Sequence, residues 1–548
     1  MIAKMNLCRV NNSSTSKLIK VRNFASVLPN EEYTVTPQYP PIQDLSYLKR
    51  LERRHEETRE SIKDVKTVEE KQIRLNMPKY YGFKSYILSE DYIPYNNLPL
   101  IQHVTRTHLI VDKELPEYYR RVYIDELVGK TKADIEEAIS IEVEGQKRLH
   151  EVIKEDLPIH EVENIFSSSI SKQINRIIIN NLKKAYPHLL DVQVDNDPRV
   201  EACWYAGGMV PPENIKRYRE GREWTKEFKD LPTDRLMSYE GKVNLSLRTN
   251  APLPAFVNYS EAENPDFDVP FFKYDPRTVG TKTLHKRIVN VPGFWPGDPN
   301  QFGILSYHPR GHLHTRERFN DPQEHKEALH RQGILASFAW LSAQANFLGF
   351  NTFNDITYPL ANQLVITNGQ TWSFYAYQLN TMLMHGKYIE KNPKKNICWA
   401  TPELKLYDNI NNGKVEGFND DVLKVLLKFY GNKPEKRLGL NMTPYLRHKE
   451  KLVADYEDDE QREWLEREYK FLVSNRPRLV EMDEMYHWEK IYKKDHKTRF
   501  MDKKLRPFEL LKKPQDRTLN DRLGKYIPRA LRPGLPRNKG RRAREFWP

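Results

Sequence analysis

The sequence has few cysteines and no long apolar segment. Its 548 residues include three cysteines, Cys8, Cys203 and Cys398, and none belongs to a C-x-x-C pair. This pattern argues against a disulfide framework and against a thiolate zinc site, and it fits a reducing compartment. No run of 18 or more apolar residues occurs, so no membrane-spanning helix is predicted.

The common catalytic and nucleotide-binding motifs are also missing. The chain contains no G-x-x-x-x-G-K-[ST] loop, no G-x-G-x-x-G after a strand and no G-x-S-x-G elbow. His325 and His330 are five positions apart and Lys326 follows the first, whereas a two-histidine zinc helix needs a spacing of four with Glu after the first histidine. None of these enzyme classes is therefore indicated, and no cofactor is predicted.

The charge is concentrated at the two ends of the chain. The net charge is +13; residues 1–30 carry five basic and no acidic side chains, and residues 501–548 carry 15 basic and 5 acidic ones. Subtracting +5 and +10 from +13 leaves −2 for residues 31–500. A nearly neutral body with basic ends favours a protein whose tails contact nucleic acid over a uniformly basic one.

Residues 1–24 have the composition of a mitochondrial presequence. The stretch is rich in Ser, Thr, Lys and Arg, and no acidic residue precedes Glu31. The order Arg22-Asn23-Phe24-Ala25-Ser26 is similar to the Arg-x-Phe/Ala-Ser pattern that matrix processing enzymes cut. A basic terminus without a targeting role is the alternative. The targeting interpretation places the protein in the mitochondrial matrix.

The pattern of predicted elements indicates an α+β fold with a central mixed α/β core, a helical N-terminal extension and a basic, extended C-terminal tail. Five regions follow from it: a presequence at 1–24, a helical and extended region at 25–188, a core at 189–435, charged helices at 436–500, and a tail at 501–548 that contacts RNA. Helices are predicted at 42–76, 132–155, 160–185, 322–347, 417–434 and 455–472, and strands at 200–208, 242–249 and 396–400. Residues 250–320 are expected to form an extended loop region.

The clearest local prediction is a β-hairpin over residues 363–379. Asn368-Gly369 separates two β-rich runs and suits a two-residue type I′ turn. Trp372, Phe374 and Ala376 would line one face of the second strand, and the alternate residues would line the other. The helix at 322–347 is expected to begin at Asp321 with Glu324 completing a capping box, and the helix at 417–434 to begin at Asn419 or Asp420.

The stretch SYHPRGHLHTRERF (306–319) is the strongest candidate for chemistry within the core. It places His308, His312 and His314 within seven positions, with Arg310, Arg316 and Arg318 among them. Three imidazoles could hold zinc, with two of them on one face of a strand, and this leaves open a metal-dependent matrix hydrolase. The arginines disfavour a divalent cation and favour phosphate or RNA. A polar loop whose histidines pack on aromatic rings is the third possibility.

The C-terminal tail is the second candidate for RNA contact. Proline and glycine keep it extended, and Phe546 and Trp547 could stack on a base or on a protein surface. Over residues 529–548, seven basic side chains occur with one acid, Glu545. The predicted contact residues are Arg529, Arg532, Arg537, Lys539, Arg541, Arg542 and Arg544. A solvated tail without a partner is the alternative.

Four stretches together resemble one family. They are WYAGGMVPP (204–212), FYAYQLNT (374–381), NPKKNICWATP (392–402) and VEGFNDDVLKVLLKF (415–429). They are similar to the mitochondrial ribosomal protein family also called programmed cell death protein nine. That family includes large-subunit protein sixty-five, once named small-subunit protein thirty, and its paralogue, large-subunit protein thirty-seven.

The resemblance implies a structural component of the mitochondrial large ribosomal subunit without enzymatic activity. It implies contact with mitochondrial ribosomal RNA and neighbouring ribosomal proteins, and pairing with the paralogue, large-subunit protein thirty-seven, as a heterodimer. It does not assign individual RNA-contact residues, so the arginines and the lysine named above rest on charge alone.

Overall fold

The computed structural model describes residues 85–437, with gaps at 91–96, 112–114, 123, 153–156, 285–289, 295–297, 349, 351–354, 387 and 412, and a few positions between 44 and 57. The predicted presequence, the acidic helix at 455–472 and the basic tail lie outside the described residues. The chain divides into two units, Met1–Leu51 and Glu52–Pro548. Residues 48–50 of the first unit are helical, as are 52, 53, 56 and 57 of the second, within the helix predicted at 42–76. All that follows concerns the second unit.

A mixed sheet of eight strands forms the centre of the fold. Its order is β2-β12-β11-β10-β9-β6-β3, with β13 paired to β11. The β10/β9 and β12/β2 pairs are parallel and the other pairs antiparallel. The bounds are β2 Thr107–Val111, β3 Gln193–Asn196, β6 Leu245–Thr249, β9 Phe302–His308, β10 Leu360–Thr367, β11 Thr371–Leu379, β12 Asn396–Ala400 and β13 Leu404–Lys405. With its helices, this sheet confirms the predicted α+β class.

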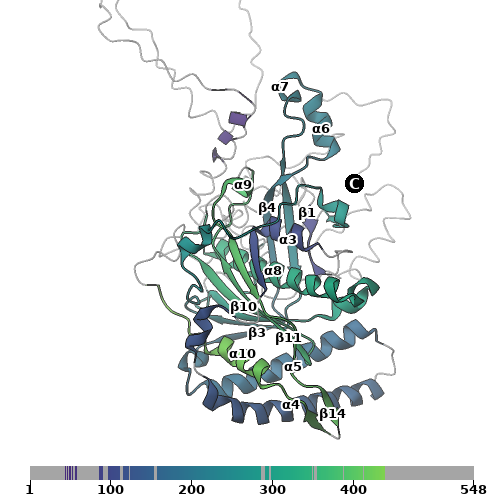
Figure 1. Ribbon diagram of the computed structural model, residues 1–548, viewed down its shortest axis with the longest axis vertical. Coiled ribbons are helices and arrows are strands. Elements are labelled where there is room, and N and C mark those ends of the chain that lie inside the picture. The colour runs from purple at the N-terminus through teal and green to yellow at the C-terminus, as the bar shows by residue number, and fades with distance from the viewer. Residues whose placement is uncertain are drawn as a thin grey trace, which may run out of the picture. The chain divides into compact units, whose positions relative to one another are not determined.

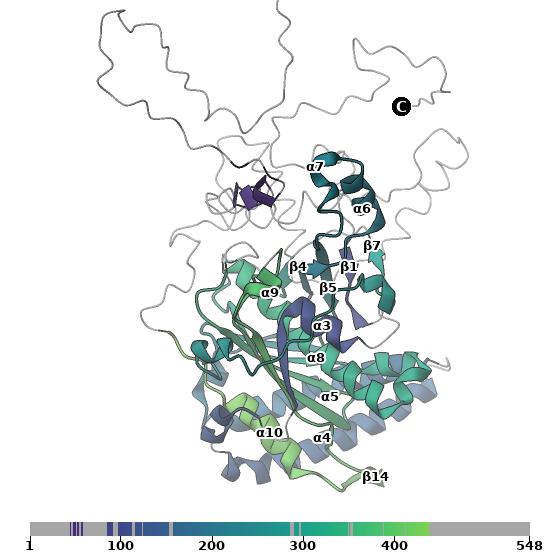
Figure 2. The ribbon, with the colours of Figure 1, turned by 45° about the horizontal axis from the view of Figure 1, so that its top comes forward.

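A second sheet of five strands has the order β7-β1-β5-β4-β8. Its strands are β1 Ser85–Ile87, β4 Val200–Met209, β5 Thr233–Gly241, β7 Thr283–Leu284 and β8 Val291–Pro292. Helices α6 (Glu213–Glu220) and α7 (Glu223–Lys226) connect β4 to β5 and project from the end of that hairpin (Figure 2). A separate small hairpin pairs β14 (Asn409–Asn411) with β15 (Lys414–Glu416).

Helix α8 (Pro322–Phe347) packs between the two sheets, beside α3 (Leu98–Thr105) (Figure 1). Nearly every residue from Ala328 onward is buried, as expected for a helix with apolar neighbours on all sides. Trp204 of β4 meets Phe338 of α8 edge to face, with ring centroids 4.9 Å apart. These contacts join the sheets into one core.

The start of α8 confirms one half of the predicted capping box. The carboxylate of Asp321 accepts a hydrogen bond from the backbone N–H of Glu324 at 3.2 Å. The other half is wrong, because the carboxylate of Glu324 accepts hydrogen bonds from the guanidinium of Arg318 instead of reaching back to Asp321.

The opposite face of the eight-stranded sheet is covered by α4 (Asp125–Val152), α5 (Ile159–Leu182) and α10 (Asp420–Gly431) (Figure 1). These are the helices predicted at 132–155, 160–185 and 417–434. Ile170, Ile174 and Ile178 of α5 are fully buried, as their spacing indicates. At α10 the open choice is settled in favour of Asn419, whose side chain accepts from the N–H of Asp421. The remaining short helices are η3 Glu117–Arg121, η4 Pro187–Leu190, η5 Tyr259–Glu263, η6 Pro276–Val279, η7 Gly311–Thr315, η8 Glu317–Asn320 and α9 Tyr388–Lys391.

The predicted hairpin is present as β10 and β11, but its turn differs from the prediction. Trp372, Phe374 and Ala376 face the α4/α5/α10 side, and Tyr375 and Tyr377 face α8, as predicted. Three residues, 368–370, connect the strands, and only Gly369 has a positive φ, of 97°. A type I′ turn needs positive φ at both central positions. Here the side-chain oxygen of Asn368 instead accepts from the N–H groups of Gln370 and Thr371.

The prediction of an extended loop over 250–320 is wrong in one important part. Residues 302–308 form β9, which lies between β6 and β10 in the centre of the sheet and is buried along its whole length. A strand buried on both faces lacks the alternation of apolar and polar residues that marks a half-exposed strand.

Within the described residues, no helix has both the length and the apolar character needed to cross a bilayer.

Candidate functional site

The three histidines of the 306–319 stretch lie in different environments. His308 ends β9, is buried, and its Nε2 lies 3.1 Å from the hydroxyl of Ser306. His312 is buried in η7, and its ring meets Phe319 edge to face at 6.3 Å. His314 is exposed, with its Nε2 3.0 Å from a carboxylate oxygen of Glu163 on α5. The strand that would have placed two histidines on one face for zinc does not form, since residues 311–315 are a 3₁₀ helix.

The electrostatics of the buried pair do not favour a metal. Burial lowers the pKa of His308 to about 3. Burial, followed by the positive charges of Arg331 and Arg310, holds the pKa of His312 well below its ordinary value. The same cations would repel a divalent metal. Among the residues that the structure describes, no group of three or more His, Cys, Asp and Glu side chains is placed to hold a metal ion. The hydrolase alternative therefore has no geometric support.

Arg310 is an internal ion-pair residue. It is 6% exposed, and its guanidinium donates hydrogen bonds to Glu403 and, at 2.8 Å, to the hydroxyl of Thr371. The Nε2 of His325 lies 2.9 Å from Arg310 Nη2 and 3.2 Å from Glu403 Oε2. Burial alone would raise the pKa of Glu403, but the hydrogen bond from His325 and the charge of Arg310 lower it to about 2. The prediction that Arg310 contacts RNA does not fit this burial.

Arg316 and Arg318 lie nearer the surface. The side chain of Arg318 is 51% exposed and forms an ion pair with Glu324, and Arg316 is half-buried at the start of η8. An RNA contact at these two residues stays a prediction. The same holds for the seven predicted contact residues of the tail, all of which lie outside the described part of the chain.

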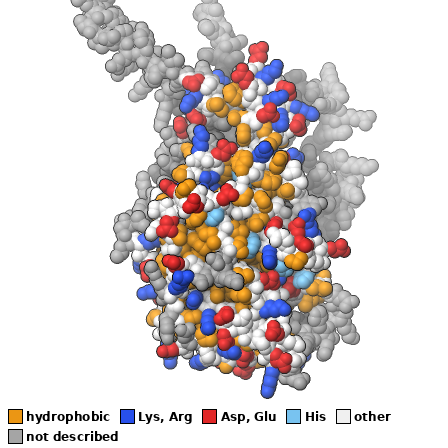
Figure 3. All heavy atoms as spheres, in the orientation of Figure 1, with side chains coloured by type: hydrophobic (Ala, Val, Ile, Leu, Met, Phe, Trp, Pro, Cys, Tyr) orange, Lys and Arg blue, Asp and Glu red, His pale blue; other side chains and the backbone are white. Residues whose placement is uncertain are grey.

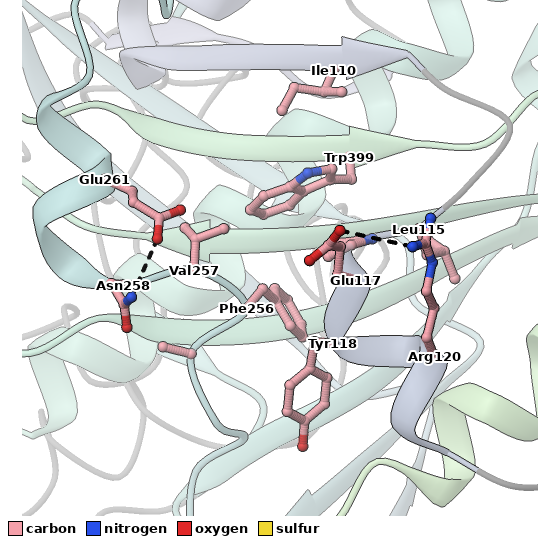
Figure 4. Close-up of a pocket in the computed structure, with 12 residues that line it drawn as sticks. Ile110, Leu115, Glu117, Tyr118, Arg120, Phe256, Val257, Asn258, Glu261 and Trp399 are labelled. Carbon is pink, nitrogen blue, oxygen red and sulfur yellow. Dashed lines mark hydrogen bonds and ion pairs between the residues drawn. The ribbon is translucent and has the colours of Figure 1, made fainter.

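A cavity of about 620 Å³ opens at one edge of the eight-stranded sheet (Figure 4). Ile110 of β2 and Trp399 of β12 lie on one side of it, and Phe256 packs edge to face on Trp399 at 5.9 Å. Glu117 and Arg120 of η3 bound it at one end and are 3.7 Å apart. Asn258 and Glu261 bound it at the other end and are joined by a 3.3 Å hydrogen bond.

Sequence reasoning missed this cavity because its lining comes from three separate segments, near residues 110–120, 255–261 and 399. Two features of the sequence nevertheless indicate the segments that line this cavity. THLIV (107–111) is a β-rich run inside the region predicted to be helical and extended. Residues 249–272 contain no Lys or Arg and include four acidic residues, an unusual balance in a chain with a net charge of +13.

The described surface shows no extended basic field in the view of Figure 3. Lys and Arg side chains alternate with Asp and Glu side chains across this face, and apolar side chains gather toward its middle (Figure 3). Such a surface favours contacts with other proteins more than contacts with phosphates.

A comparison with protein-family models decides the assignment. The model described as Mitochondrial 28S ribosomal protein S30 (PDCD9) matches residues 5–434, most of the chain. The chain belongs to this family of mitochondrial ribosomal proteins. All four stretches on which the resemblance rested lie inside the match, so that prediction is confirmed.

Membership of the family has two direct consequences. A mitochondrial ribosomal protein is located in mitochondria, and its surroundings there are ribosomal RNA and other ribosomal proteins.

The match ends at residue 434, close to the end of α10, so the basic tail at 501–548 lies beyond it.

Proposed function

We propose that this chain is a structural component of the large subunit of the mitochondrial ribosome, in the matrix. The family match carries the proposal, and the charge distribution supports it. A nearly neutral body suits contacts with protein neighbours, and a tail of net charge +10 suits contact with ribosomal RNA.

The family description and the sequence resemblance indicate different subunits of the mitochondrial ribosome. The family description names the 28S subunit, whereas the resemblance to large-subunit proteins sixty-five and thirty-seven implies the large subunit. Gradient sedimentation of a mitochondrial lysate at low Mg²⁺, which separates the two subunits, tests this directly. The chain is expected in the large-subunit peak. A peak with the small subunit would overturn the assignment to the large subunit.

We further propose a heterodimer with the paralogue, large-subunit protein thirty-seven. Co-expression of the two full chains with an affinity tag on one is expected to recover both in equal amounts. Recovery of the tagged chain alone, at physiological salt, would contradict the pairing.

A protein with this role has no enzymatic activity. A metal assay on the full-length protein, with His312→Ala as the variant, separates a scaffold from the metal-dependent hydrolase. Zinc bound at one equivalent per chain and lost on His312→Ala would overturn the structural role. A soluble RNA-binding regulator outside the ribosome would instead appear in the light fractions of the gradient.

A further inference from the structure

Among the described residues, no strand pairs with the outer edge of β2. β2 is the terminal strand of the eight-stranded sheet and pairs with β12 on one side. The carbonyl of Arg106 accepts from the N–H of Asn396 at 2.9 Å and so points toward β12. Because successive strand residues alternate in direction, the N–H and C=O of Leu109 and the N–H of Val111 point away from β12. No backbone hydrogen bond from the described residues reaches these groups.

β2 also lacks the features that usually protect an edge strand. Its sequence, THLIV, contains no proline and no lysine, and its register with β12 runs from Thr107 to Val111 without a bulge. The side chain of Val111 is 58% exposed. Natural proteins normally block such an edge with a charge, a proline or a bulge, because it is a template for another strand.

The cavity lies beside this edge, on one face of the sheet. Ile110 is directly opposite Trp399 in the register, so both side chains point to the same face and toward the cavity (Figure 4). A strand added beside β2 would place every second side chain over this face. With a volume of about 620 Å³, the cavity has room for a large apolar side chain of such a strand.

The charges around the edge of β2 indicate which kind of ligand could bind there. The segment from the cavity along β2 carries Glu261, Glu263, Asp266 and Asp268, all exposed, and Asp268 accepts from the ring of His108 through its carbonyl at 2.7 Å. Glu117 adds a carboxylate at the other end. The nearby cations among the described residues include Arg120, paired with Glu117, Lys395, which donates to the carbonyl of Asn264, and Lys394, which donates to the hydroxyl of Tyr259, so the carboxylates outnumber them. This acidic border repels phosphates and attracts a basic peptide.

We propose that the edge of β2 and the adjoining cavity bind an extended segment of a neighbouring protein by strand addition. The segment carries an apolar side chain that fills the cavity beside Ile110 and Trp399, and Lys or Arg side chains that meet the acidic border. Main-chain hydrogen bonds to Leu109 and Val111 supply affinity, and the cavity supplies specificity. The inference deepens the proposed function, on which it rests for the identity of the neighbour.

A defined peptide tests the site on the full-length chain. The probe is a blocked, fluorescent hexapeptide, Val-Lys-Val-Trp-Val-Lys, measured by anisotropy at physiological salt; its two lysines share the face of its tryptophan, so all three side chains point toward the cavity and its acidic border. Val111→Pro removes the outward N–H and leaves the ladder to β12 intact, because proline is tolerated where the N–H of an edge strand faces outward. Val111→Thr is the matched control that keeps the N–H. We expect Val111→Pro to weaken binding at least tenfold and Val111→Thr to change it less than twofold.

A charge reversal tests the border independently of the backbone. Glu261→Lys is expected to weaken the peptide about fivefold, with Glu223→Lys on α7 as the control, since Glu223 is exposed and away from the cavity. A peptide with Glu in place of Lys is expected not to bind. Hydrogen exchange resolved to single residues should show protection of Leu109 and Val111 by the Lys peptide. If Val111→Pro fails to fold, Glu261→Lys and the exchange data decide the question.

Three results would overturn the inference. They are absence of binding by the unaltered chain at millimolar peptide, equal binding by Val111→Pro and Val111→Thr, and displacement of the peptide by a ten-nucleotide uridine RNA. Self-association that Val111→Pro abolishes would assign the edge to a second copy and also reject the proposed partner. Gradient sedimentation keeps the two proposals apart. If Val111→Pro weakens peptide binding but the chain sediments in light fractions, only the ribosomal role is rejected. If Val111→Pro leaves peptide binding unchanged and the chain sediments with the large subunit, only the docking site is rejected.

Discussion

Replacing Glu403 with glutamine should lower the free energy of unfolding by about 2 kcal/mol at pH 7. The carboxylate is the counter-ion of Arg310, whose side chain is 7% exposed, so its loss leaves a buried guanidinium charge without compensation. The pKa of Glu403 falls from 4.5 to about 2, which corresponds to about 3 kcal/mol at roughly 1.4 kcal/mol per unit. The side chain of Glu403 is 28% exposed, and solvent screening reduces this figure to about 2 kcal/mol.

The lowered pKa of Glu403 also predicts how its contribution to the free energy of unfolding depends on pH. Because the pKa of Glu403 is lower in the folded state, its stabilisation is present above about pH 4.5 and is lost as the pH falls toward 2. The difference in unfolding free energy between the unaltered chain and Glu403→Gln should therefore shrink over that window. Urea unfolding of the full chain at pH 7, 4 and 3 measures this difference.

Glu317→Gln is the matched control, since Glu317 is exposed on η8, in the same region of the chain as Arg310. It should change the free energy of unfolding by less than about 0.5 kcal/mol at each pH. Equal effects of the two substitutions at pH 7, or a Glu403→Gln effect that does not diminish at pH 3, would refute the structural role assigned to Arg310.

Three further predictions concern packing, capping and the tail. Gly333→Ala should destabilise the chain by about 1–3 kcal/mol in urea unfolding, because a Cβ there would lie 2.5 Å from the ring of Tyr375. The control is Gly129→Ala, which has open space around it and should stabilise α4 by about 0.5–1 kcal/mol. Asn419→Ala should cost about 1 kcal/mol in the same assay through loss of the α10 cap, and an unchanged midpoint would contradict that role. Truncation after Pro528 should weaken association with the particle and flatten its salt dependence while the core stays folded; unchanged binding at low and high salt would reject the RNA-contact role of the tail.

Local chemistry explains which parts of the fold were predictable. Helices α8 and α10 have apolar spacing and an N-cap residue close to it in the sequence, so Asp321 and Asn419, the second being one of two candidates, mark their starts. Helix α5 was predictable from its apolar spacing alone, since no side chain caps its start. The two faces of β11 were also predictable, because alternation along one strand is a local property. The turn was not, because the hydrogen bonds of the Asn368 side chain favour a longer loop over the type I′ geometry that Asn-Gly usually takes.

The rest depends on contacts between distant segments. β9 is buried on both faces and shows no alternation. β2 has a β-rich sequence, but its place at the edge of the sheet depends on its pairing with β12, almost 300 residues further along the chain. The role of Arg310 depends on Glu403, 93 positions away. Charge counting placed Arg310 with Arg316 and Arg318, because sequence shows which residues carry charge but not which of them are buried beside a counter-ion.

The proposed role as a structural component of the mitochondrial large ribosomal subunit can be checked by quantitative mass spectrometry. Large subunits are purified from mitochondria and washed at moderate salt before the measurement. We expect about one copy of the chain per particle, in constant ratio to the other large-subunit proteins. A chain that is absent from these particles, or that is recovered in the small subunit or in light fractions, would contradict this role.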